Sequence, residues 1–309
     1  MDIAVLEWLA DNRTGFLTKL LSILTKAGGE IAVIALVCLI YWCFNRRLGN
    51  RMLLTMTSGL LINQLLKILF VAHRPWVRSP ERVRPHEGAL GDATGYSFPS
   101  GHTANAVSAY GGLAHEKGLK PVFKVLLWLL VALVAFSRLY LGVHTPQDVL
   151  VSLALGIVLI FAMDKLSAKL EEKPSLDIVI AGCALIMSVL TLVITLVRSY
   201  PAESVEGEIA ANTADIFKLV GAIVGIMAGW LCERRLIGFE TPKKWWLGVL
   251  RLVVGMGLVL ALLKGTKSAF ISLAGKNWGG VIRYALSCFA AVFLWPLAYT
   301  RYEKLLIKQ

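Results

Sequence analysis

The feature that most constrains this chain is a series of apolar segments, most of them close to the roughly 20 residues that cross a membrane as a helix. Within a bilayer, backbone N–H and C=O groups must be hydrogen-bonded inside the protein, so such segments form helices. The sequence therefore predicts an all-α, polytopic transmembrane helical bundle with about nine spans. The expected spans are residues 29–44, 53–72, 101–114, 122–140, 149–163, 178–197, 216–231, 246–263 and 281–299.

The composition agrees with a membrane protein. Of the 309 residues, 57% are apolar and 17% are charged, whereas soluble domains carry about 45–50% apolar and about 25% charged residues. This balance excludes a soluble globular protein, and so apolar a chain is not disordered. The 5 cysteines form no CxxC pair, so neither a disulfide framework nor a zinc site is expected.

The pattern divides the chain into three parts. Residues 1–28 alternate apolar and charged positions, which predicts N-terminal helices lying in the membrane interface rather than spanning it. Residues 29–170 form a core of five spans, and residues 171–309 form a C-terminal membrane extension of four spans.

The formal net charge of +12 is explained by topology. Every second connection between the expected spans is rich in Lys and Arg, and the positive-inside rule makes these connections cytoplasmic. With nine spans, the N-terminus then lies outside and the C-terminus is cytoplasmic. Most of the charge therefore orients the protein, and no nucleic-acid partner is expected.

One external connection, residues 73–100, departs from this rule because it is rich in arginine. We interpret these arginines as a response to a bound anion. The histidines of the loop, His73 and His86, are interpreted as solvated. The loop arginines are Arg74, Arg78, Arg82 and Arg84.

Three short motifs fall on the same predicted external face. Lys67 and Arg74-Pro75 close the second span, and Pro99-Ser100-Gly101-His102 opens the third. Ser137-Arg138, His144 and Asp148 bridge the fourth and fifth spans. The topology therefore brings three motifs that are separate in sequence to one side of the membrane.

The basic and small residues of these motifs suit a phosphate group. The guanidinium groups of Arg74 and Arg138 match phosphate oxygens bidentately, and Lys67 adds a point charge. Ser100 and Gly101 lie at a helix start, where backbone N–H groups favour an anion. These five residues predict a phosphate-binding site.

Two histidines add catalytic groups that phosphate binding alone does not require. His144 precedes Asp148 by four residues, so the carboxylate can hold one ring nitrogen and leave the other lone pair free to attack phosphorus. His102 comes from another helix and is placed to protonate the leaving oxygen and then activate water. Each motif alone has a simpler structural interpretation, but their coincidence on one face favours catalysis.

The combined pattern K-x6-R-P, P-S-G-H and S-R-x5-H-x3-D resembles the signature of the type 2 phosphatidic acid phosphatase (PAP2) superfamily of integral-membrane lipid phosphatases, closely over residues 60–165. The resemblance implies hydrolysis through a phosphohistidine without metal or cofactor. It makes His144 the nucleophile, Asp148 its orienting partner and His102 the general acid and base. The remaining residues hold the phosphoryl group: Lys67, Arg74, Ser100, Gly101 and Arg138.

The resemblance also sets an expectation for the architecture. The family core usually has six spans, and here the interfacial N-terminal segment replaces the expected first one. Residues 29–170 then form a PAP2-type core. Extra C-terminal spans are similar to those of the sphingosine-1-phosphate phosphatases, which carry Thr where this chain has Gly101.

The substrate stays open at this point. The leading hypothesis is a membrane lipid phosphate, namely phosphatidate, phosphatidylglycerophosphate, a sphingoid phosphate or a polyprenyl diphosphate, at the extracytoplasmic or lumenal leaflet. The alternatives are a soluble phosphate ester, because nine spans with an external N-terminus resemble glucose-6-phosphatase, and a non-catalytic binder or transporter of lipid phosphates. In the extension, the Gly221, Gly225 and Gly229 face either packs within the chain or forms a homodimer.

Overall fold

The computed structural model describes residues 2–200 and 205–307, and helices supply all the regular secondary structure within these ranges. The predicted all-α fold class is thereby confirmed. Part of the expected external connection after the sixth span, residues 201–204, and the two last residues of the predicted cytoplasmic tail lie outside the described residues.

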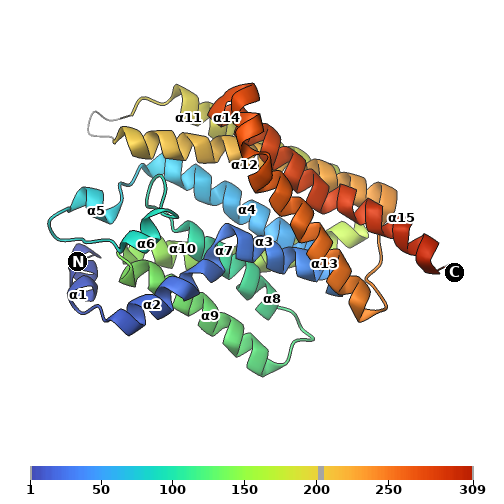
Figure 1. Cartoon of the computed structure of the whole chain (residues 1–309), viewed down its shortest axis with the longest axis horizontal. Helices are drawn as coiled ribbons and strands as arrows, with labels where there is room; N and C mark the ends of the chain where they lie inside the picture. Colours follow the sequence, from blue (N-terminus) through green and yellow to red (C-terminus); the bar gives the residue numbers. More distant parts are fainter. Residues whose placement is uncertain (1, 201–204, 308–309) are drawn as a thin grey trace. The chain divides into compact units, whose positions relative to one another are not determined.

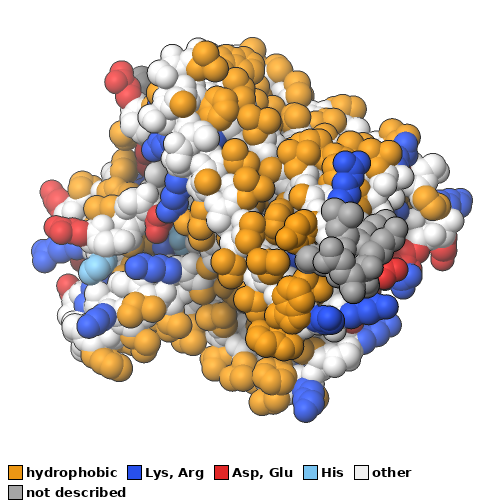
Figure 2. Space-filling view, turned by 45° about the vertical axis from the view of Figure 1, so that its right-hand side comes forward, with side chains coloured by type: hydrophobic (Ala, Val, Ile, Leu, Met, Phe, Trp, Pro, Cys, Tyr) orange, Lys and Arg blue, Asp and Glu red, His pale blue; other side chains and the backbone are white. Residues whose placement is uncertain are grey.

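Among the described residues, seven helices are long and apolar enough to cross a membrane, and they coincide with seven of the expected spans. Figure 2 shows apolar side chains over much of one face of the molecule, as expected for a surface in contact with lipid. The chain is an integral membrane protein with several spans. The seven helices are Arg46–Arg78, Pro121–Tyr140, Pro146–Glu172, Leu176–Val197, Glu206–Ile237, Trp245–Gly265 and Lys267–Glu303.

The expected count of nine is not confirmed, because two windows give shorter helices. Residues 101–114 form α7 (Gly101–Ala106), the π-helix η3 (Val107–Gly111) and α8 (Gly112–Ala114), together about 21 Å at 1.5 Å per residue. Residues 29–44 qualify only together with residues 15–28, as a pair of helices bent at Gly29. By length and composition, the part of the chain that the structure describes therefore has seven candidate spans, or eight if the bent pair is one span.

The chain divides into two compact units, and the predicted site residues all lie in the first. This unit comprises Met1–Ile34, Arg51–Leu166 and Arg198–Asn212. Its α2 (Gly15–Leu24) and α7 both pack against α9 (Pro121–Tyr140), as Figure 1 shows. The other helices that reach the site are α4 (Arg46–Phe70), α5 (Pro75–Arg78), α6 (Glu87–Leu90) and α10 (Pro146–Glu172).

The N-terminal helix α1 (Asp2–Asp11) packs against the arginine-rich loop. Its buried Ile3 and Leu6 contact Val83. After the helix, Arg13 donates from Nε to the Tyr140 carbonyl at 2.9 Å and from Nη1 to the Arg84 carbonyl at 2.7 Å. The segment is therefore attached to the site-bearing end of α9; its assignment as a separate interfacial part stays a prediction.

The same helix changes the explanation of the loop arginines. Arg82 pairs with Glu7 at 2.6 Å, and Arg78 pairs with Asp2 at 3.1 Å, while the Arg84 side chain is exposed. The hydrogen bond from Arg82 lowers the pKa of the Glu7 carboxyl, so the pair is charged at neutral pH. The interpretation of the loop arginines as a response to a bound anion was therefore wrong for Arg78 and Arg82, because their partners are acidic side chains of the chain itself.

The second unit comprises Ala35–Asn50, Ser167–Val197 and Thr213–Gln309. Its helices are α3 (Glu30–Leu39) beyond Ile34, the π-helix η2 (Ile40–Phe44), the end of α10, α11 (Leu176–Val197), most of α12 (Glu206–Cys232), η4 (Glu233–Ile237), α13 (Trp245–Leu260), η5 (Ala261–Gly265), α14 (Lys267–Phe289), η6 (Ala290–Leu294) and α15 (Trp295–Ile307).

The glycine face of α12 is used inside this unit. A Cβ atom at Gly221 would collide with the Val281 backbone, and one at Gly225 would collide with the Ala285 backbone, both on α14. Glycine is required because the two helix backbones approach closely. Of the two alternatives for this face, the structure shows packing within the chain.

Candidate active site

Arg74 lies where the chain leaves α4 and turns into α5, and its side chain is buried, with 3% exposed. Backbone carbonyls hold the guanidinium group in place. Nε donates to Gly95 at 2.9 Å, Nη2 to Thr94 at 2.6 Å and Nη1 to Val143 at 2.9 Å. Gly95 has a φ of +61°, a conformation that favours glycine. The loop backbone therefore fixes the direction of the Arg74 side chain.

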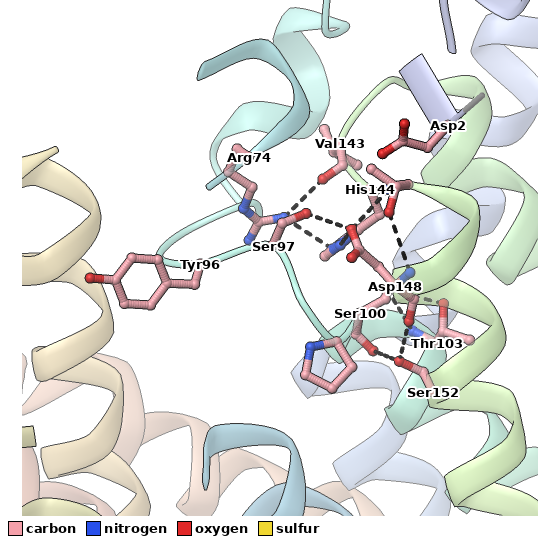
Figure 3. Close-up of polar contacts among 12 residues, drawn as sticks. Asp2, Arg74, Tyr96, Ser97, Ser100, Thr103, Val143, His144, Asp148 and Ser152 are labelled. Carbon is pink, nitrogen blue, oxygen red and sulfur yellow. Dashed lines mark hydrogen bonds and ion pairs between the residues drawn. The ribbon is translucent and has the colours of Figure 1, made fainter. Parts of the chain in front are cut away.

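His144 lies in the tight turn between α9 and α10, and Asp148 lies in the first turn of α10. His144 Nδ1 is 3.3 Å from Asp148 Oδ2, and its Nε2 is 3.0 Å from Arg74 Nη1 (Figure 3). The same Asp148 oxygen accepts hydrogen bonds from Ser97 Oγ at 2.5 Å and from the Thr145 N–H at 2.8 Å. Both ring nitrogens of His144 therefore have defined partners.

Electrostatics keep the His144 ring neutral. Burial lowers the pKa of His144 well below its usual range, and the positive charge of Arg74 lowers it further, while Asp148 acts in the opposite direction. With Asp148 accepting at Nδ1, the proton of the neutral ring sits on Nδ1. The Nε2 lone pair then faces the Arg74 N–H group.

Ser100 caps α7 and joins it to the Asp148 turn. Its Oγ accepts from the Thr103 N–H at 3.4 Å and from the Thr103 hydroxyl at 3.0 Å. Its own N–H donates to the Asp148 carbonyl at 3.2 Å. At Gly101, no heavy atom of the described residues outside the local helix backbone and the two chain neighbours lies within 4 Å of the place where a Cβ would be, so there is open space beside the start of the helix.

The other cations surround this cluster. Lys67 donates from Nζ to the Tyr96 carbonyl at 2.8 Å. Arg138 is fully buried and donates from Nη1 to Thr25 Oγ1 at 2.9 Å. Its Nε and Nη2, and likewise His102 Nε2, are buried without a hydrogen-bond partner among the described residues. Buried donors that lack partners are rare and call for an explanation.

The structure thus brings the predicted residues into one cluster. His144, Asp148 and Arg74 are in direct contact, and Ser100 contacts Asp148 through its backbone. His102 interacts electrostatically with the four other cationic or imidazole groups of the set: Arg138, His144, Arg74 and Lys67.

Several contacts in the cluster come from residues that the sequence analysis did not single out. Ser97 donates to Asp148, Thr25 accepts from Arg138, and Glu208 of α12 accepts from the Arg74 N–H at 3.0 Å. Glu208 also lies 2.6 Å from His73 Nδ1. The interpretation of His73 as a solvated histidine was therefore wrong. No local pattern marks Thr25 or Glu208, because their partners are far away in the sequence.

Comparison with known proteins places this geometry in a family. Residues 48–171 match the model of the PAP2 superfamily, and residues 217–305 match that of the PAP2 superfamily phosphatase, transmembrane extension. Undecaprenyl-diphosphatase BcrC of Bacillus subtilis is 30% identical over 169 residues, which cover 52% of this chain and 80% of that protein. The chain belongs to the PAP2 superfamily.

Two further PAP2 relatives are longer than the region they share with this chain. Phosphatidylglycerophosphatase B of Bacillus subtilis is 34% identical over 133 residues, 40% of this chain and 60% of that protein. Lipid phosphate phosphatase delta of Arabidopsis thaliana is 25% identical over 248 residues, 76% of this chain and 58% of that protein. The chain therefore spans about three fifths of these relatives. No solved structure is significantly similar to it.

The PAP2 match separates the site into two groups of residues. All eight predicted site residues lie within residues 48–171. Thr25 and Glu208 lie outside both matched segments, yet each contacts an arginine of the cluster.

Proposed function

We propose that this chain is a metal-independent phosphatase of membrane lipid phosphates that works through a phosphohistidine. The observation that carries the proposal is the set of unpartnered buried donors on Arg138 and the free ring nitrogen of His102, next to the neutral His144. A phosphoryl group would provide acceptors for these donors. The printed names of the relatives, which include a phosphatidylglycerophosphatase and an undecaprenyl-diphosphatase, support a lipid phosphate as the substrate.

In the first step, the Nε2 lone pair of His144 attacks phosphorus and forms a P–N bond. The P–O ester bond breaks, and its electron pair goes to the leaving oxygen, which takes a proton from His102, protonated once the negatively charged phosphate lies beside it. The Arg74 N–H that contacts Nε2 becomes free to donate to a phosphoryl oxygen. Asp148 stabilises the positive charge that develops on the His144 ring.

In the second step, neutral His102 removes a proton from water, and the resulting hydroxide attacks phosphorus. The P–N bond breaks, its electron pair returns to His144 Nε2, and inorganic phosphate leaves. Lys67, Arg74, Ser100, Gly101 and Arg138 hold the phosphoryl oxygens in both steps. Donors aimed at these oxygens in a buried site stabilise the charge of the transition state.

The proposal places the reaction at the extracytoplasmic or lumenal face, with the N-terminus outside and the C-terminus in the cytoplasm. Its support is the charge distribution. The ends of α9 and α10 remote from the site carry basic residues, Lys120 and Lys124 at the start of α9 and Lys165 and Lys169 toward the end of α10. Reporter fusions at both termini test this arrangement, and a cytoplasmic N-terminus would contradict it.

The test is a turnover panel with purified protein in detergent and EDTA. It compares phosphatidate, phosphatidylglycerophosphate, a sphingoid phosphate and a polyprenyl diphosphate with soluble sugar phosphates. We expect phosphate release from at least one lipid, and loss of that release in His144→Ala. A strict metal requirement or an active His144→Ala variant would overturn the mechanism. Turnover of soluble esters alone, or binding without turnover, would overturn the assignment to lipid phosphates.

A further inference from the structure

We propose that Glu208, in the first turn of α12, is a positioning residue that holds Arg74 in the phosphate site. The proposal rests on the proposed function, because it concerns the same site. It assigns part of that site to a helix that follows the segment matching the PAP2 superfamily model.

Glu208 contacts two successive residues, the side chain of His73 and the backbone N–H of Arg74. Glu208 lies in the first turn of α12 and is 8% exposed. Its Oε1 accepts from the Arg74 N–H at 3.0 Å, and its Oε2 lies 2.6 Å from His73 Nδ1. A buried carboxylate requires partners for its oxygens, and here each oxygen has one at this pair of residues.

The position of the Arg74 backbone determines where its guanidinium group lies. Arg74 precedes Pro75, which restricts its backbone to extended conformations, and its φ and ψ are −60° and 149°. The guanidinium group then reaches His144 Nε2 at 3.0 Å. A shift of the backbone would move the donor away from the atom that attacks phosphorus.

Two other residues near Glu208 in the sequence contact the segments on either side of Arg74, namely the end of α4 and the loop at Gly95. Arg198 donates to the carbonyls of Ile68 and Leu69 at the end of α4. Asn212 packs on Gly95, whose missing Cβ would lie 3.2 Å from the Asn212 side chain. Gly95 supplies the carbonyl that accepts from Arg74 Nε. The start of α12 therefore supports Arg74 at its backbone through Glu208 and at its side-chain acceptor through Asn212.

Glu208 therefore acts through its hydrogen bonds rather than through its charge. A negative charge close to the site repels a phosphate group, so the charge of Glu208 cannot by itself favour substrate binding. A glutamine in its place keeps an oxygen that accepts from the Arg74 N–H. An alanine removes both contacts and leaves a buried N–H without its partner.

The experiment compares Glu208→Ala with Glu208→Gln, and Glu206→Ala is the matched control because Glu206 is an exposed acid of the same helical turn. The measurements are kcat, KM and the inhibition constant of orthovanadate, a phosphate-shaped competitor. We expect Glu208→Ala to lower kcat/KM about 100-fold, as misplacement of a catalytic group does, and to weaken vanadate inhibition in parallel. Glu208→Gln should stay within about fivefold of the wild type, and Glu206→Ala should be unchanged.

The outcomes separate positioning from a structural role. If Glu208→Ala only lowers the fraction of folded protein, kcat falls while the vanadate inhibition constant stays that of the wild type, and the proposal is wrong. It is equally wrong if Glu208→Gln is as impaired as Glu208→Ala. Should the alanine variant fail to fold, Glu208→Asp keeps the charge with a shorter reach, and unchanged vanadate inhibition in that variant overturns the proposal.

The two proposals fail in different ways. If the wild type turns over no phosphate ester, the proposed function fails. Direct vanadate binding to the wild type and to Glu208→Ala then still tests positioning, because Arg74 would bind the anion with or without turnover. Equal affinities would contradict the role of Glu208.

Discussion

Two buried arginines, one in each unit of the molecule, have opposite surroundings. Arg251 of the second unit is 4% exposed, and its Nε and Nη2 bond to Glu303 at 2.8 and 2.6 Å. Its Nη1 donates to the Trp42 and Glu240 carbonyls, and its guanidinium group lies 3.9 Å from the centre of the Tyr299 ring. Arg138 of the first unit is fully buried, and two of its nitrogens lack a partner among the described residues.

The difference distinguishes a buried cation whose partners the chain supplies from one whose donors are only partly satisfied by the described residues. Burying a charge is unfavourable unless the charge is paired and hydrogen-bonded. Around Arg251 the chain itself supplies those partners, so the buried charge of the second unit is compensated without a ligand. Around Arg138 it supplies the Thr25 hydroxyl and leaves donors for an anion. In the proposed function, a bound phosphate supplies the acceptors that Arg138 lacks.

The largest expected effect tests the binding side of this comparison. Arg138→Met keeps an unbranched apolar side chain but removes the guanidinium donors, so kcat/KM for a lipid phosphate should fall about 1,000-fold. The free energy of unfolding should not fall, since a poorly paired buried charge disappears. Steady-state kinetics and denaturant unfolding in detergent measure the two quantities. A variant that loses stability but keeps its activity would show that Arg138 is structural.

The reverse result is expected at Arg251. Arg251→Met leaves the partly buried Glu303 without its partner, so the free energy of unfolding should fall by about 3 kcal/mol, the lower end of the range for breaking a buried pair. The kcat per folded molecule should stay close to that of the wild type, because Arg251 makes no contact in the site. Denaturant unfolding with an active-site titration distinguishes these quantities. A loss of kcat without a loss of stability would show that Arg251 also contributes to activity, and the contrast with Arg138 would be wrong.

A smaller effect is expected from the partner of Arg138. Thr25→Val removes the acceptor of Arg138 Nη1 and keeps the shape of the side chain, so kcat/KM should fall about tenfold, the value of one hydrogen bond to a charged group. Thr25→Ser keeps the hydroxyl and should restore activity. If serine does not rescue the kinetics, packing rather than the hydrogen bond is what matters at this position.

The smallest effect is a shift of the pH profile. Burial, then Arg74, and after them the charge of Arg138 lower the pKa of His144, so the ring stays unprotonated below the usual histidine range. Removing the Arg138 charge raises this pKa, and the fall of kcat/KM on the acid side should begin at a higher pH. The ratio of Arg138→Met to wild type across pH cancels the ionisation of the substrate. Arg251→Met should give a flat ratio.

Local patterns were sufficient for much of the fold and the site. Seven spans follow from hydropathy, because an apolar helix long enough for the bilayer is a property of a continuous segment. The contact between His144 and Asp148 follows from a spacing of four residues at a helix start. The other two windows failed for different reasons: the helical run Gly101–Ala114 is too short to qualify as a span, and residues 29–44 are separated from residues 15–28 by a bend at Gly29, which hydropathy does not report.

What the sequence determined by itself is therefore the membrane helices and the chemical groups of the site, since both depend on neighbouring residues. The tertiary structure decided which partner each charge has. Arg78 and Arg82 pair with α1, His73 and Arg74 contact Glu208, and Arg138 contacts Thr25. The physical reason is that a charge takes its partner from whatever the fold brings within a few ångströms, and no spacing along the chain records that distance.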